Sequence, residues 1–202
     1  MILANENVAK YLKRNGLNTI FRNHERPPDE KIKLLKKFLK ERNFYNNESF
    51  KKQSDFVKML NKIPLNNSFL SDSLLRTQAK AYYKCENIGH FGLGIDYYTH
   101  FTSPIRRYSD LNVHRDLLDF IGKKKKNIIE KSLPEHLTTQ EKKSDIIERN
   151  ILERACSLYI RNIKKKYFTG YIDAIESFGI FIKAIELPFS CLVRIKKNYY
   201  NF

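Results

Sequence analysis

Apolar residues recur at helical spacing through most of the chain, most clearly between residues 30 and 42. The apolar side of this segment consists of Ile32, Leu35, Phe38 and Leu39. Lysines occupy the other side, as in an amphipathic helix. Pro27-Pro28-Asp29 precedes the segment, and proline beside an acidic residue is typical of a helix start. The pattern predicts a helix over Glu30–Arg42.

Similar spacing predicts further helices. We expect a short helix over Asn5–Arg14, a weak one around Phe56, and another over Leu70–Lys84. The longest is expected over Glu141–Lys166. Its apolar face consists of Ile147, Ile151, Ala155 and Leu158. Three glycines within Gly89–Gly94 exclude a regular helix and predict a turn or short strand.

Ser103-Pro104 indicates one more helix by its chemistry. Serine is a strong N-cap, and proline suits the first helical position. We expect this helix to run to Ile121 and to stop at Gly122.

After Tyr167 the apolar positions alternate instead. Aromatic and β-branched residues over Tyr167–Ile175 and Gly179–Ile185 predict two strands joined by a turn. We therefore expect an α/β (α+β) fold, with a helix-rich domain over 1–165 and a small β domain over 166–202.

Composition adds a strong positive charge. Lys and Arg outnumber Asp and Glu 38 to 22, so the net charge is +16. Such a field attracts polyanions such as RNA, DNA or an anionic membrane surface. Lys, Asn and Ile are abundant throughout the chain, and a base-composition bias in the coding DNA would also produce this abundance. The charge alone therefore supports RNA binding only modestly.

The three widely spaced cysteines have no neighbouring ligand pattern. They predict neither a zinc site nor a disulfide framework and favour a reducing compartment. Polar residues interrupt the N-terminal segment where a signal peptide needs an apolar run, and no segment is long and apolar enough for a membrane span. We expect a cytoplasmic protein without a membrane partner.

The residues that carry chemistry are densest between His100 and Arg115. This segment offers backbone N–H groups at the predicted helix start, the hydroxyls of Thr102 and Ser103, and the guanidiniums of Arg106 and Arg107. These groups suit an anion, and arginine matches a phosphate with planar paired donors. The alternative is that Arg106 or Arg107 only pairs with Asp110 or Asp116 along the helix.

The segment His100-Phe-Thr-Ser-Pro-Ile-Arg-Arg-Tyr-Ser-Asp-Leu111, followed by His114-Arg115, closely resembles the signature of the RNB-type exoribonucleases of the ribonuclease R kind. The resemblance extends to Met1-Ile2-Leu3-Ala4-Asn5, Phe21-Arg22-x-His24-x-x-Pro27, Leu74-Leu75-Arg76 and Gly89-His90-Phe91-Gly92-Leu93. Residues 170–172 and 178–181 look like the start of the S1-like OB-type RNA-binding barrel that ends those enzymes. By this resemblance, residues 1–165 are the C-terminal part of an RNB catalytic domain and residues 166–202 are a truncated barrel.

The resemblance implies hydrolysis of single-stranded RNA from its 3′ end, with release of nucleoside 5′-monophosphates and with Mg²⁺ as the family's cofactor. By motif position, Arg106 matches the catalytic arginine that holds the scissile phosphate and stabilises charge on it. The other residues implied at the RNA site in this segment are His100, Thr102, Ser103, Arg107 and Tyr108. His100 and Tyr108 are expected to shape the site rather than to transfer protons.

Outside this segment the implied RNA contacts are Glu153, Phe178 and Phe181. Glu153 falls where the family places a glutamate near the terminal nucleotides, although pairing with Arg149 or Arg154 explains it equally well. Phe178 and Phe181 could stack on bases, but strand phenylalanines more often pack in a core.

The acidic metal ligands of the family have no counterpart here. Two-metal hydrolysis needs carboxylates that hold two divalent ions about 4 Å apart, and the aspartates of this chain form no tight D-x-D-D run. In the family these aspartates precede the segment that begins here at Met1. We therefore expect a fragment without a metal site of its own.

Three interpretations stay open. The chain is part of a split exoribonuclease whose upstream polypeptide carries the metal site, a non-catalytic RNA-binding remnant, or the product of a decayed gene. We expect single-stranded RNA as the partner and no DNA.

Overall fold

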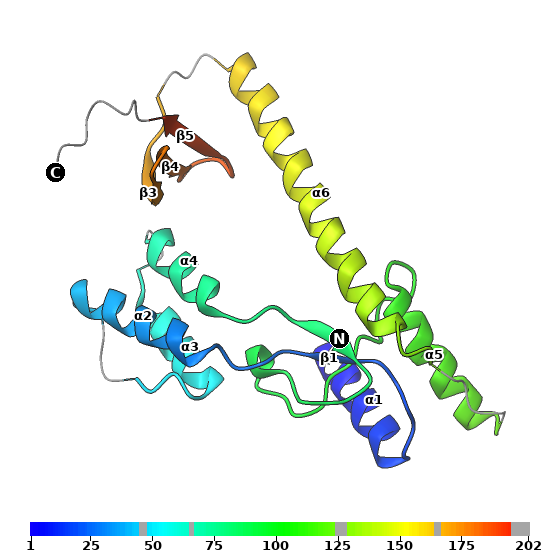
Figure 1. Cartoon of the computed structure of the whole chain (residues 1–202). Helices are drawn as coiled ribbons and strands as arrows, with labels where there is room; N and C mark the ends of the chain where they lie inside the picture. The colour runs from blue at the N-terminus through cyan, green and yellow to red at the C-terminus, as the bar shows by residue number, and fades with distance from the viewer. Residues whose placement is uncertain (45–47, 65–66, 124–128, 164–166, 195–202) are drawn as a thin grey trace. The chain divides into compact units, whose positions relative to one another are not determined.

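The computed structural model describes residues 1–44, 48–64, 67–123, 129–163 and 167–194 (Figure 1). The chain forms two compact units, Met1–Pro64 with Leu70–Glu141, and Leu65–Phe69 with Lys142–Phe202. Both helices and antiparallel strands are present, so the predicted α/β (α+β) class is confirmed. Along the chain, the division between the units falls after residue 141, whereas the predicted domain boundary falls after residue 165. The assignment of residues 1–165 and 166–202 to two domains stays a prediction.

Helices dominate the first unit. They are α1 (Ile2–Arg14), α2 (Asp29–Glu41), α3 (Gln53–Lys62), most of α4 (Ser68–Thr77), the 3₁₀ turn η1 (Phe91–Leu93), α5 (Tyr108–Ile121) and the start of α6 (Leu133–Asn162). α2 matches the amphipathic pattern, with Pro28 at its N-cap. Asp29 and Glu30 lie in its first turn, where their negative charge complements the helix dipole.

A hydrophobic core holds α2, α3 and α4 together. Its buried members are Ile32, Leu35, Leu39, Phe50, Phe56, Met59, Ile63, Leu70 and Leu74. The rings of Phe50 and Phe56 lie 4.9 Å apart between centroids. The core covers three residues of the apolar stripe of α2. This burial is the reason that the stripe predicted the helix correctly.

A two-stranded antiparallel sheet links distant parts of the first unit. β1 (Phe21–Asn23) pairs with β2 (Tyr82–Lys84), and Arg22 lies opposite Tyr83. The predicted helix over Leu70–Lys84 is therefore wrong beyond Thr77, where α4 ends. Pairing with β1 satisfies the backbone of residues 82–84, so a tertiary contact overrides their local spacing.

α6 begins at Leu133 rather than at the predicted Glu141. Ser132 precedes it and Pro134 lies in its first turn, where the missing N–H of proline has no cost. The His136 N–H donates to the Ser132 carbonyl over 3.0 Å, which closes the first turn.

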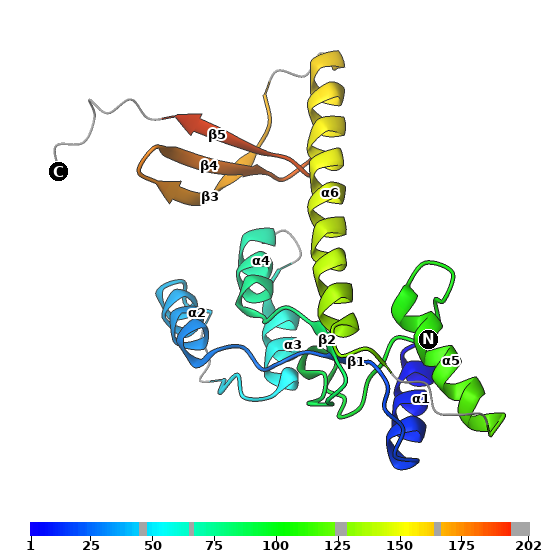
Figure 2. The same cartoon turned by 45° about the vertical axis from the view of Figure 1, so that its right-hand side comes forward.

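The second unit combines the rest of α6 with a three-stranded antiparallel sheet (Figure 2). The strand order is β3 (Gly170–Glu176), β4 (Gly179–Ala184) and β5 (Ser190–Arg194). Gly179 permits a close approach to β5, because a Cβ there would lie 2.6 Å from the Val193 carbonyl oxygen. The described strands form an open sheet, and residues 195–202 of the predicted barrel lie outside the described residues.

Among the residues that the structure describes, no helix has both the length and the apolar content to cross a membrane.

Candidate phosphate-binding site

The segment before α5 forms a tight turn instead of the predicted helix start. The backbone N–H groups of Arg106 and Arg107 both donate to the Ser103 carbonyl, over 3.3 and 3.1 Å. α5 begins only at Tyr108, so Ser103 is not its N-cap, and that prediction is wrong. The reason is that serine at the first and proline at the second position also suit a β-turn.

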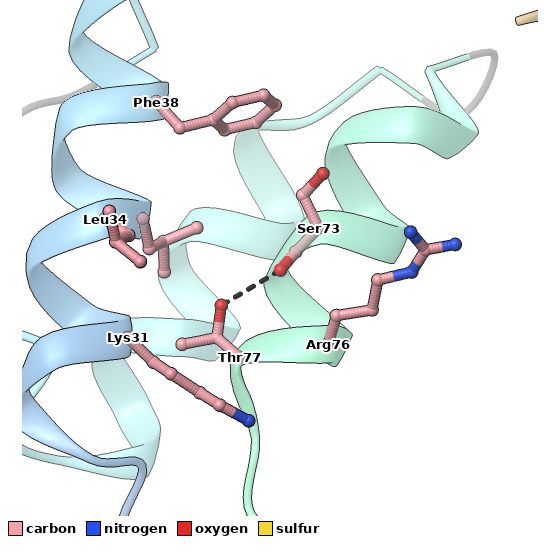
Figure 3. A pocket seen from close by; sticks show the side chains of 7 residues that line it. Lys31, Leu34, Phe38, Ser73, Arg76 and Thr77 are labelled. Atoms are coloured by element: carbon pink, nitrogen blue, oxygen red, sulfur yellow. Dashed lines mark hydrogen bonds between the residues drawn. The ribbon is translucent and has the colours of Figure 1, made fainter. Parts of the chain in front are cut away.

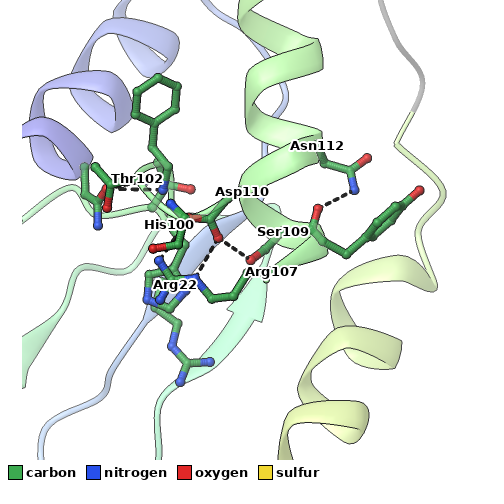
Figure 4. A network of polar contacts seen from close by, with 12 residues as sticks. Arg22, His100, Thr102, Arg107, Ser109, Asp110 and Asn112 are labelled. Atoms are coloured by element: carbon green, nitrogen blue, oxygen red, sulfur yellow. Dashed lines mark hydrogen bonds and ion pairs between the residues drawn. The ribbon is translucent and has the colours of Figure 1, made fainter. Parts of the chain in front are cut away.

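Asp110 holds this turn against the first turn of α5 (Figure 4). Its fully buried carboxylate accepts the Ser103 N–H over 2.8 Å and two guanidinium N–H groups of Arg107 over 2.8 and 2.9 Å. The Ser109 hydroxyl lies 3.1 Å from the same carboxylate. Burial alone would raise the pKa of Asp110, but the hydrogen bonds from Arg107 and Ser103 outweigh it and lower the pKa.

The two neighbouring arginines therefore differ. Arg107 is committed to Asp110, as the alternative interpretation of the pattern had it, and this contact raises the pKa of Arg107. The Arg106 side chain is exposed and has no hydrogen bond or ion pair with any residue of the described ranges. Arg106 is the guanidinium of this pair that remains available to an external anion.

Behind Arg107 lies a network that joins α6 to the β1–β2 sheet. Arg22 on β1 forms a two-point ion pair with Glu141 on α6, at 2.5 and 2.9 Å. The Arg22 guanidinium also lies 4.7 Å from the ring centroid of Tyr83. The Tyr83 backbone N–H donates to the Thr138 hydroxyl over 2.9 Å. The start of α6 is thus fixed to the sheet that supports the turn.

His100 is held neutral inside this network. Its Nδ1 lies 2.8 Å from the Tyr83 hydroxyl, and Ser109 Oγ lies 3.2 Å from the same hydroxyl. Burial, reinforced by the positive charges of Arg107 and Arg22, lowers the pKa of His100 to about 3. The neutral Nδ1 accepts a hydrogen bond from the Tyr83 hydroxyl. The role of His100 at an RNA site stays a prediction.

The loop that leads into the turn is fixed from α1. The buried Asn5 amide donates to the Tyr98 hydroxyl over 3.0 Å, and its carbonyl oxygen accepts the N–H groups of Phe101 and Thr102 over 3.2 Å. Because the N–H groups of Thr102 and Ser103 already have these internal acceptors, the expected array of free N–H groups is wrong. At this turn the Arg106 side chain, rather than these N–H groups, is therefore the donor open to an external anion.

A pair of stacked histidines lies beside this loop. His24 and His90 stack with ring centroids 5.1 Å apart, and the Gly92 N–H donates to His24 Nδ1 over 3.0 Å. A Cβ at Gly92 would lie 3.3 Å from the His24 ring, which explains the glycine. Burial, with the neighbouring charge of His24, lowers the pKa of His90 to about 4.

The remaining predicted contacts lie elsewhere. Tyr108 is the exposed first residue of α5, and the Arg115 guanidinium lies 5.9 Å from its ring centroid. Glu153 is exposed on α6 in the second unit. Phe178 is exposed in the β3–β4 turn, and its ring meets that of Phe181 on β4 edge to face at 6.0 Å. The RNA-binding roles of these residues stay predictions.

In the described ranges, no group of three or more His, Cys, Asp or Glu side chains could hold a metal ion, so the residues present do not fit a two-metal centre. A hollow of about 330 Å³ lies between α2 and α4, with Lys31 and Arg76 near an apolar wall that includes Leu34 and Phe38 (Figure 3). It contains no residue of the predicted site.

Sequence reasoning missed several residues that support the turn. Asn5 and Arg22 lie in or near segments that resemble the family, which was a usable signal. Tyr83 and Glu141 had no such signal, because their roles depend on partners far away in the chain.

Comparison with known proteins gives consistent matches. The RNB domain model matches residues 1–123. The chain is 36% identical to the ribonuclease R of Thermotoga maritima and 32% identical to that of Buchnera aphidicola subsp. Schizaphis graminum, in each case over 100% of this chain and 30% of the relative. The solved structure of Mycoplasma genitalium RNase R in complex with ribose-methylated single-stranded RNA has a TM-score of 0.84 and 32% identity, over 96% of this chain and 32% of that one.

The chain thus spans about a third of the length of these relatives. The family model and the two sequence matches cover the turn that carries Arg106 and the helix α5 that follows it. This chain belongs to the RNB domain family.

Proposed function

We propose that this chain supplies the phosphate-holding part of a ribonuclease R-like enzyme that degrades single-stranded RNA from its 3′ end and releases nucleoside 5′-monophosphates. The observation that carries the proposal is the contrast between Arg107, locked by Asp110, and the exposed, unpaired Arg106 within the described residues. Similarity to a ribonuclease R solved in complex with RNA supports the same substrate class.

Within this proposal, Arg106 binds a phosphate oxygen of the RNA and stabilises the charge that develops on it. Asp110 and the turn at Ser103 hold the Arg106 backbone in place. His100 and Tyr108 border the bound strand, and the net charge of +16 attracts it over a longer range. Glu153, Phe178 and Phe181 provide further RNA contacts.

The divalent metal of the reaction, Mg²⁺ in the family, has no fitting ligand set among the described residues. We propose that a further polypeptide segment supplies the metal ligands and that the enzyme acts in the cytoplasm. Without that segment this chain binds RNA but does not cut it. The second candidate function, non-catalytic RNA binding, is favoured by the same lack of clustered carboxylates.

RNA binding by the isolated chain tests the role of Arg106. We expect Arg106→Gln to weaken binding of a single-stranded RNA by about tenfold, or about 1.4 kcal/mol, and to lower the salt slope by about 0.7. Arg14→Gln is the matched control, because Arg14 is also exposed and the change removes the same charge. Equal losses in both variants would show that Arg106 adds only general charge.

A second assay separates the two functions. The chain is incubated with 5′-labelled single-stranded RNA and Mg²⁺, and products are resolved as a band ladder. We expect intact RNA at every time point. A ladder produced by the isolated chain would refute the claim that its metal ligands lie elsewhere.

A further inference from the structure

The second half of α6 has an apolar face that its own unit does not cover. Ile147, Ile151 and Leu158 follow the spacing i, i+4, i+11, so they lie on one side of the helix. Their exposed fractions are 58%, 62% and 60%. We name these three residues the α6 stripe. It is about 16 Å long at 1.5 Å per residue.

The opposite side of α6 is the side that contacts the strand region of the second unit. Cys156 lies about 140–180° around the helix from each residue of the α6 stripe. It is buried, and its Sγ lies 3.8 Å from the carbonyl oxygen of Pro188, which precedes β5. The α6 stripe therefore faces away from the part of its own unit that covers the helix.

A row of cations follows one edge of the α6 stripe. Lys143, Arg154 and Arg161 lie about 20–40° from Ile147 around the helix, and all three are exposed. None of them has an ion pair with another residue in the described ranges. A surface that fits this face would combine apolar side chains with a parallel row of carboxylates.

We infer that the α6 stripe, with its cation row, is the docking surface for the part of a ribonuclease R-like polypeptide that lies outside these 202 residues. This inference rests on the proposed function. The relatives are about three times as long as this chain, so a large protein surface is available to cover the stripe. A buried aliphatic stripe bordered by charges is the usual anatomy of such an interface.

Two other occupants fit less well. A second copy of this chain brings the same cation row and the same net charge of +16, so pairing sets like charges against each other. Single-stranded RNA suits the cations, but it is bound by aromatic side chains that stack on bases, and the α6 stripe is aliphatic. The partner with apolar and acidic groups is therefore a protein.

Sedimentation velocity without RNA tests the inference. The probes are the parts of the Mycoplasma genitalium and Thermotoga maritima ribonucleases R that lie outside the segment matched by this chain. We expect a 1:1 complex with at least one of them at micromolar concentration. Ile151→Asp should weaken it by on the order of a hundredfold, because a charge would be buried in an apolar contact.

Matched variants on the same helix exclude two other causes of weaker binding, a general effect of charge and a loss of helix. Ile146→Asp makes the same substitution at an exposed position about 100–140° around the helix from the α6 stripe and outside the cation row, so its complex should match wild type. Arg154→Glu should weaken the complex by about tenfold, whereas Arg149→Glu, on the Cys156 side, should have little effect. Circular dichroism of each variant confirms that the helix content is unchanged.

Three results would overturn the inference. They are no complex with either probe, a complex that tolerates Ile151→Asp, and self-association of the chain alone that Ile151→Asp abolishes. If Ile151→Asp lowers RNA affinity and Ile146→Asp does not, the surface belongs to RNA, which overturns the inference as well. The proposed function has its own test, which needs no probe protein. It fails if Arg106→Gln and Arg14→Gln weaken RNA binding equally.

Discussion

Replacement of Asp110 is the most informative perturbation of the candidate site. The carboxylate is fully buried and accepts three N–H groups from Ser103 and Arg107. In Asp110→Ala all three donors lose their acceptor. In Asp110→Asn the shape is kept, but the charge is lost and an amide N–H₂ faces the Arg107 guanidinium.

The size of the effect follows from the surroundings. Breaking a buried ion pair costs about 3–5 kcal/mol when the remaining charge stays unpaired. Arg107 is 24% exposed, so water compensates part of that loss. We expect Asp110→Ala to lower the free energy of unfolding by about 3 kcal/mol, and Asp110→Asn by about 2 kcal/mol.

Urea denaturation at pH 7, followed by circular dichroism, measures both values. RNA binding by the folded fraction of Asp110→Asn should weaken as well, because the turn that presents Arg106 loosens. This is expected even though the variant is more positive by one charge. Asp145→Asn is the control, since it changes the net charge equally at an exposed position on α6. Free energies of unfolding within about 0.5 kcal/mol of wild type for the Asp110 variants, roughly the limit of detection, would refute the view that this carboxylate holds the turn.

Three further predictions concern other parts of the first unit. The unfolded chain binds a proton at His100 near pH 6.5, whereas the folded pKa is about 3, so the free energy of unfolding should fall as the pH drops below 6.5. Between pH 7 and 5 the contribution of His100 averages about 1 kcal/mol per pH unit, because the unfolded group titrates within this range. His90 adds a contribution of the same sign, so His100→Asn should lower the total slope in urea titrations at pH 7 and 5 by about 1 kcal/mol per pH unit; an unchanged slope would contradict the assignment. Leu39→Ala should lower the free energy of unfolding by about 3 kcal/mol, whereas Leu34→Ala, at an exposed position of the same helix, should cost under about 0.5 kcal/mol; Leu39 is fully buried and Leu34 is 67% exposed. Glu141→Gln should cost about 1–2 kcal/mol because it breaks the ion pair with Arg22, and hydrogen exchange should then be faster in the first turns of α6; exchange at the wild-type rate would count against this clamp.

Features that depend on neighbouring residues were predictable from the sequence. The stripe of Ile32, Leu35 and Leu39 predicted α2 because helical spacing decides which side chains share a face. Alternation after Tyr167 predicted β3 and β4 for the same kind of reason. The motif from His100 to Asp110 was long enough to indicate the family that residues 1–123 match.

Tertiary structure decided what depends on distant partners. Residues 82–84 became a strand because β1 offered backbone partners, and Ser103-Pro104 became a turn because the Asp110 carboxylate takes the Ser103 N–H. Both outcomes were compatible with the local sequence. The same holds for the site: the pattern presented Arg106 and Arg107 as equivalent, and only the position of Asp110 in three dimensions binds one guanidinium and leaves the other exposed.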